Sequence, residues 1–303
     1  MAVQAGSISG FIRTLKQSPL ESAIAALLLV LYTPLVLHWV DGWLNKSISI
    51  QHEYFSHGLI GIPFALYLAW SHRQRWISLP ERWHPLGLGL VAVAAVFYLS
   101  GLSDWMNLSL PLLLIGLCLC LKGWEGLQLQ AFPLALIALA TPTQLPYLIE
   151  PYVLPLQHFI ASVAGFLLIQ TGVDVTVQSI YLFVNGQTVE VAPHCAGLKM
   201  LFTSLYVALM LLCWTGVWTS RLRTSLFLVG TVAISVIGNI LRNTFLSYFH
   251  GTGNTAAFDW LHESWGGDLY SALMLLSLIG LIRLIQEYVP TSLELETAPP
   301  SDF

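Results

Sequence analysis

Three side chains could do chemistry within a largely apolar chain, and the first is a cysteine. Cys195 lies in the segment APHCAGLKM, where a β-rich stretch ends and a long apolar helix is expected to begin. The positive end of a helix dipole favours a thiolate, and Lys199 would share the face of Cys195. This context predicts a nucleophile with Lys199 near its substrate. The alternative is a small apolar cysteine that fills a gap, the usual role of membrane cysteines.

The second side chain is Arg242, in the segment ISVIGNILRNTFLSYF. Helical spacing places Ser235, Asn239, Arg242, Asn243 and Ser247 on one face. A guanidinium that is always charged needs an anion or a wet cavity at membrane depth. The alternative is an arginine that extends to the membrane surface, but that does not explain the two asparagines beside it. We therefore assign Asn239 and Asn243 to substrate binding, next to Arg242.

The third side chain is His262, in DWLHESWGG, a segment expected to be a loop before the last apolar run. A single loop histidine is usually an ordinary surface residue, so its assignment depends on where the chain places it. His57 opens the second apolar run and is a further candidate for the substrate site. His194 adjoins Cys195, but neighbouring side chains point apart in a strand, so we expect no dyad between them.

Composition excludes several classes of protein. Of 303 residues, 56% are hydrophobic and 9% are charged, whereas a soluble domain carries roughly 25% charged residues. The chain is therefore expected to be an integral membrane protein with the lipid bilayer as its partner. The net charge is -4 without a basic tract, so no nucleic-acid partner is expected. No two histidines have metal-site spacing, and neither a phosphate loop nor G-x-S-x-G is present, so no metal or cofactor is expected.

Apolar runs long enough to approach the thickness of a bilayer recur along the chain. They lie near 20–40, 57–71, 86–102, 107–121, 125–141, 151–171, 197–219, 224–249 and 268–288. Arg13 and Lys16 precede the first run, and no small-residue cleavage site follows it cleanly. We therefore expect this run to be a retained span.

The positive-inside rule tests the number of spans. Arg13 and Lys16 place the N-terminus in the cytoplasm, and Arg221 and Arg223 are cytoplasmic only if one run between 123 and 219 does not cross. The run 151–171 contains prolines, a glutamine and a histidine, so we expect it to be interfacial or re-entrant. The prediction is an all-α polytopic protein with about eight transmembrane helices and both termini in the cytoplasm.

A β element is expected within 173–194, because residues alternate from Val173 and Asn185-Gly186 is typical of a type I′ hairpin turn. The topology places this element outside the cytoplasm. Residues 1–289 are expected to form one membrane domain, and the acidic, proline-bearing stretch 290–303 a disordered cytoplasmic tail. The same topology places Cys195, Arg242 and His262 together on the extracytoplasmic face.

With these motifs, the chain resembles the exosortase/archaeosortase family of membrane cysteine transpeptidases, including its cyanobacterial members. Four segments carry the resemblance, which covers about residues 50–288: Tyr54–Gly58 followed by Trp70, Cys195–Gly197, Asn239–Arg242, and His262–Gly266, which fits His-x-x-x-Gly. The family usually has Cys-Ser-Gly where this chain has Cys-Ala-Gly. Ala196 therefore has no hydroxyl beside the nucleophile, so a hydrogen bond from the family's serine hydroxyl cannot form in this chain.

The resemblance implies a thiol protease or transpeptidase of the cytoplasmic (inner) membrane, with an extracytoplasmic active site formed by Cys195, Arg242 and His262. Its substrates would be exported proteins with a C-terminal sorting motif, an apolar helix and a basic cluster. The enzyme would cleave near the motif and pass the protein to a surface acceptor, a process that accompanies exopolysaccharide export in some relatives.

A different class of function remains open. A transporter or a non-catalytic subunit for polysaccharide export would use Arg242, Asn239 and Asn243 to line a substrate path. That function predicts broken helices in paired halves, and the sequence shows no such internal symmetry. It also leaves Cys195 without a role.

Overall fold

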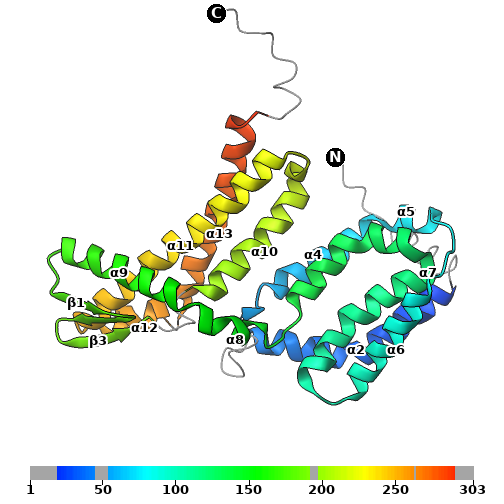
Figure 1. The fold of residues 1–303 in the computed structure, drawn as a ribbon, viewed down its shortest axis with the longest axis horizontal. Helices are drawn as coiled ribbons and strands as arrows, with labels where there is room; N and C mark the ends of the chain where they lie inside the picture. The colour runs from blue at the N-terminus through cyan, green and yellow to red at the C-terminus, as the bar shows by residue number, and fades with distance from the viewer. Residues whose placement is uncertain (1–18, 45–53, 192–196, 263, 291–303) are drawn as a thin grey trace, which may run out of the picture.

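The computed structural model describes residues 19–44, 54–191, 197–262 and 264–290. The described chain is mainly helical, with one small sheet (Figure 1). Its elements in chain order are α2 (Pro19–Leu44), α4 (Gly58–Ser71), α5 (Arg73–Ser78), α6 (Pro85–Leu99), α7 (Ser103–Ala140), α8 (Leu145–Ile149), η1 (Glu150–Tyr152), α9 (Leu154–Gln170), β1 (Val175–Gln178), β2 (Tyr181–Val184), β3 (Gln187–Glu190), α10 (Leu198–Thr215), η2 (Val217–Thr219), α11 (Arg221–Gly251), α12 (Thr255–His262) and α13 (Trp265–Tyr288).

The protein is a multi-pass membrane protein. Among the described residues, five helices are long and apolar enough to cross a bilayer, namely α2, α7, α10, α11 and α13, and three shorter apolar helices, α4, α6 and α9, accompany them. Many large apolar side chains lie exposed on these helices, such as Val30 and Leu99 at 75% and 80% exposure. Every predicted apolar run corresponds to one of these helices or to one arm of α7.

Helix α7 contains two arms that meet at a glycine. Gly123 has φ 62° and ψ -151°, a conformation that is not helical and that is essentially restricted to glycine. Figure 1 shows the two arms running in opposite directions on either side of this point. Lys122 is buried at the bend and donates to the Leu79 carbonyl oxygen (3.0 Å). This bend explains why the sequence shows separate apolar runs at 107–121 and 125–141.

The sheet has the order β1-β2-β3 and is antiparallel throughout. Asn185 (φ 48°) and Gly186 (φ 81°) connect β2 to β3 with positive φ at both turn positions, as a type I′ turn requires. This predicted hairpin is confirmed. A second hairpin, turning at Ser179 (φ 59°) between β1 and β2, was not predicted. Residues 192–194 of the predicted β element lie outside the described residues.

The sheet packs between α9 and the C-terminal end of α11. A Cβ on Gly165 of α9 would lie 2.3 Å from Val177, and a Cβ on Gly251 would lie 2.2 Å from Val184. Asn185 also donates to the carbonyl oxygen of Gly251 (3.2 Å). Glycine at both positions therefore lets the two helices approach the strands closely, and the sheet lies at the end of α11 that is nearer to Arg242.

Two halves of the molecule meet at α10. We call α2 to α7 the N-terminal half, and α9 to α13 with the sheet the C-terminal half (Figure 1). Within the C-terminal half, Leu212, Phe227 and Leu278 are fully buried where α10, α11 and α13 pack together. The Tyr206 hydroxyl of α10 donates to the Leu136 carbonyl oxygen of α7 (2.9 Å), which links the two halves.

Candidate functional site

The predicted polar face of α11 is largely buried. Asn239 and Asn243 are 2% and 5% exposed, and Ser235 and Ser247 are also buried. Arg242 lies half-buried beside them, and its Nε is buried without a hydrogen-bond partner among the described residues. Because a guanidinium N–H needs an acceptor when it leaves water, this face has the capacity to bind a polar or anionic group.

The two asparagines of this face orient each other. Asn243 Nδ2 donates to the backbone oxygen of Asn239 (2.9 Å) and to its Oδ1 (3.3 Å). A backbone carbonyl can only accept, so the orientation of the Asn243 amide is determined, and Asn239 must present Oδ1 to it. Asn239 Nδ2 therefore points away from Asn243. It is buried, with no acceptor among the described residues.

Asn239 packs directly against Gly197, the residue at the start of α10. A Cβ on Gly197 would lie 2.5 Å from Asn239 Cγ and 2.7 Å from its Nδ2. Gly197 also has φ 81°, in the left-handed region, which favours glycine. Both the close approach and the backbone conformation therefore require glycine here. Cys195 itself lies outside the described residues, as do His194 and Ala196.

The chain is anchored on both sides of residues 192–196. On the incoming side, Gln157 of α9 is buried and donates to the Val191 carbonyl oxygen (2.8 Å), while the Val191 N–H donates to Ile180 (2.9 Å). On the outgoing side, Gly197 rests on Asn239. Gln157 was not among the predicted site residues, although a glutamine within an apolar run was the available signal.

His262 lies at the end of the short helix α12, whereas the sequence predicted a loop there. It is half-buried, and its ring stacks on Phe258, with ring centroids 5.2 Å apart. A Cβ on Gly266 would lie 2.6 Å from the Trp260 carbonyl oxygen. Gly266 of the His-x-x-x-Gly motif therefore allows the tight connection from α12 into α13.

Tyr270 joins α13 to the Arg242 region and was not predicted. Its hydroxyl donates to the Gly238 carbonyl oxygen on α11, one turn before Arg242. Tyr270 and Arg242 also interact electrostatically. Since α13 begins shortly after α12 ends, these contacts bring the start of α13 to the part of α11 that carries Arg242. Figure 1 shows α12, which ends at His262, beside the same end of α11.

The two remaining candidates lie on other elements. Lys199 is half-buried in the first turn of α10. His57 is buried, with Nε2 3.1 Å from the Leu139 carbonyl oxygen and its ring 4.3 Å from that of Tyr206. The contacts that position His57 are thus with α7 and α10 rather than with the polar face of α11.

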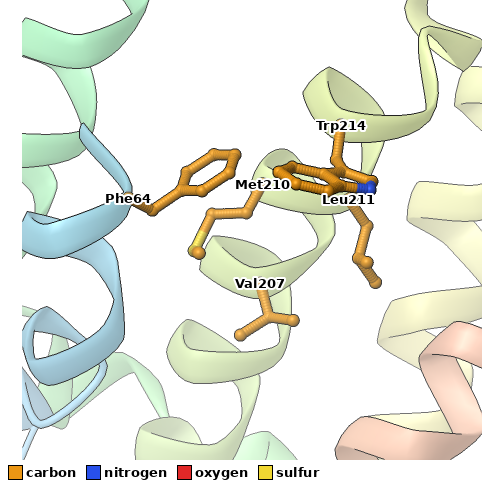
Figure 2. Close-up of a pocket in the computed structure, with 5 residues that line it drawn as sticks. All are labelled: Phe64, Val207, Met210, Leu211 and Trp214. Atoms are coloured by element: carbon orange, nitrogen blue, oxygen red, sulfur yellow. The ribbon is translucent and has the colours of Figure 1, made fainter. Parts of the chain in front are cut away.

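An apolar groove lies apart from this polar face, between α4 and α10 (Figure 2). Its volume is about 310 Å³. Figure 2 shows Phe64 of α4 facing Met210 and Trp214 of α10 across it; Val207 and Leu211 complete the lining. Within the described part of the chain, no group of three or more histidine, cysteine, aspartate or glutamate residues could hold a metal ion.

Comparison with known proteins identifies one family. The model of the transmembrane exosortase family matches residues 43–279, well over half of the chain. The match includes all of the segments that contain Cys195, Arg242 and His262. No curated protein and no solved structure matches the chain.

Proposed function

Because this chain belongs to the transmembrane exosortase family, we propose that it is a membrane-embedded cysteine protease/transpeptidase. It cleaves the C-terminal sorting signal of exported proteins through a thioester on Cys195 and transfers them to a surface acceptor. The contact between Gly197 and Asn239 is the observation that carries this proposal. Two Cα steps of about 3.8 Å each separate Cys195 from Gly197, which supports a position for the thiol near the polar face of α11.

The proposed reaction begins with the Cys195 thiolate, which attacks the carbonyl carbon of the scissile peptide bond. A carbon–sulfur bond forms, and the carbonyl oxygen becomes an oxyanion. When the intermediate collapses, the carbon–nitrogen bond breaks and His262 donates a proton to the departing amine. His262 then takes a proton from the acceptor nucleophile as it attacks the thioester. The acceptor bonds to the carbonyl carbon, the carbon–sulfur bond breaks, and the Cys195 thiolate leaves, ready for the next cycle. Arg242 supplies a fixed positive charge for the thiolate or for the oxyanion.

The proposed topology has eight spans, an extracytoplasmic site and residues 1–289 as one domain of the cytoplasmic membrane. The spans are α2, α4, α6, the two arms of α7, α10, α11 and α13. Helix α9 packs on the sheet and on α11, which supports its position outside this set. Arg73, Lys122 and Arg221 then all lie on the cytoplasmic side. Arg223 joins the cytoplasmic ends of α11 and α13 by donating to the Val289 carbonyl oxygen (2.7 Å).

The proposal is tested with the Cys195→Ala variant in membranes that also contain a tailed substrate. We expect processing to stop while membrane insertion stays normal, because only the nucleophile is lost. A thioester between wild-type Cys195 and the substrate should be trapped by acid quench and mass spectrometry.

Cys213→Ala is the matched control, since Cys213 lies on the same helix α10 but about 24 Å along it from Gly197 at 1.5 Å per residue. It should process substrate normally. Continued release of the substrate tail by Cys195→Ala would end the catalytic proposal and would favour an export subunit.

A further inference from the structure

The start of α10 combines two features that favour a negative charge. The N–H groups in the first turn of a helix have no acceptor within that helix and form its positive end. Among the described residues, the N-cap of α10 is Gly197, which has no side chain to accept from these N–H groups. A helix start alone does not define a ligand site, and a second N–H donor that points to the same place would define one.

Asn239 supplies that complementary group. Its side chain is 2% exposed, it lies against Gly197, and its Nδ2 has no acceptor among the described residues. Burying an amide N–H without an acceptor is unfavourable, so such a group points to a ligand that accepts from it during function. Asn243 holds the amide in this orientation by donating to Asn239 Oδ1 (3.3 Å).

We infer that Asn239 Nδ2 and the first turn of α10 together form the oxyanion hole for thioester formation. This inference rests on the proposed function and deepens it. The carbonyl oxygen of the scissile bond accepts from both donors as the carbon–sulfur bond forms, and it returns to a carbonyl when the carbon–nitrogen bond breaks. Arg242 is then left to stabilise the thiolate. Asn239 acts on the reacting atoms, and Asn243 acts as a positioning residue through Asn239.

The decisive variant is Asn239→Asp, which keeps the shape of the side chain and an acceptor for Asn243 but replaces the N–H donor with oxygen. We expect the single-turnover rate of thioester formation to fall by about 10²–10³-fold, the loss typical of removing one oxyanion donor. Alkylation of Cys195 by iodoacetamide, followed by mass spectrometry of the Cys195 peptide, serves as the second readout. Alkylation displaces iodide and creates no oxyanion, so its rate and its pH dependence should stay unchanged in a variant that removes the donor without adding charge, whereas the carboxylate of Asn239→Asp would itself disfavour a nearby thiolate.

Two further variants keep the test conclusive. Asn239→Leu removes the donor without adding charge, and Asn243 retains its 2.9 Å bond to the backbone oxygen of residue 239; it should lose acylation to a similar degree. Thr231 is a buried position of α11 about 12 Å from Asn239 towards the N-terminal end of the helix. Thr231→Val removes a hydroxyl that bonds only to Phe227 among the described contacts, and this variant should acylate normally.

Each outcome decides the assignment. Acylation within threefold of wild type in Asn239→Asp would overturn it. A shift in the pH dependence of alkylation in Asn239→Leu would assign the donor to the thiolate instead. A loss of acylation in Asn239→Leu but not in Asn239→Asp would reduce Asn239 to a packing residue. If wild-type protein forms no thioester at Cys195, the proposed function fails; if it does and Asn239→Asp is unaffected, only this inference fails.

Discussion

Gly197 and Asn239 come from different helices, yet each limits what the other can be. A side chain at residue 197 would overlap the Asn239 amide, and residue 197 also adopts a left-handed backbone conformation. Such a conformation costs about 1–3 kcal/mol for a residue other than glycine. The start of α10 and the polar face of α11 are therefore coupled at a single contact.

Gly197→Ala tests this coupling. We expect a lower melting temperature in detergent and a loss of processing of at least tenfold, because the new Cβ displaces the Asn239 amide. Gly216→Ala is the control: Gly216, after the other end of α10, has φ 70° but open space around a Cβ. Gly216→Ala should lose stability in the same way, because alanine is also unfavourable at this positive φ, but it should keep its processing activity. Equal activity losses in the two variants would contradict a specific role for the contact with Asn239.

Sequence spacing was sufficient to predict the polar face of α11, because residues of one helix share a face by simple periodicity. It could not predict the contact between Asn239 and Gly197, the bond from Tyr270 to Gly238, or the bond from Gln157 to Val191. Each of these joins residues on separate elements, so each depends on tertiary packing. The nucleophilic role of Cys195 stays a prediction.

Among the helices and strands, the bend of α7 is the feature most dependent on one residue. Gly123→Ala should destabilise the protein by at least about 1–3 kcal/mol, because its φ and ψ are nearly exclusive to glycine. The added Cβ would also lie 2.9 Å from the Arg82 carbonyl oxygen. Thermal unfolding in detergent measures the effect. Gly89→Ala, inside α6 with open space around its Cβ, should be neutral or slightly stabilising; an equal loss there would refute the importance of the bend.

Local signals account for most of the elements. Runs of apolar residues predicted the helices, and Asn185-Gly186 predicted the β2–β3 turn because both positions need positive φ. The β1–β2 turn was missed because Ser179-Ile180 carries no comparable signal. Helix α12 was missed because eight residues between two spans are too few to show a clear period.

For the molecule as a whole, the proposed topology predicts which connections face outward. Ala256, at the start of α12, and Thr219, between α10 and α11, are both exposed. In intact cells, a membrane-impermeant maleimide should label Ala256→Cys but not Thr219→Cys, measured against wild-type labelling. Labelling of Thr219→Cys should appear once the membrane is permeabilised. Equal labelling of both in intact cells would contradict the arrangement of α10 and α11 as spans with the site outside.

Composition and the distribution of arginine and lysine predicted a multi-pass protein. Charge is costly in lipid, so charged residues are few and lie mainly between the spans. They could not predict how the two halves pack against each other. His57 illustrates the reason: its place between Leu139 and Tyr206 depends on three helices, and no spacing along the sequence encodes that meeting.

The groove between α4 and α10 has an energetic consequence for the protein in its bilayer. Lipid tails are as apolar as Phe64, Met210 and Trp214, so closing the groove would gain almost no hydrophobic free energy. In lipid, the hydrophobic effect therefore does not drive the N-terminal and C-terminal halves together at this groove. Their relative orientation depends instead on direct contacts between the halves: the two buried clusters that contain side chains from both, and the hydrogen bond from Tyr206 to the α7 backbone beside His57.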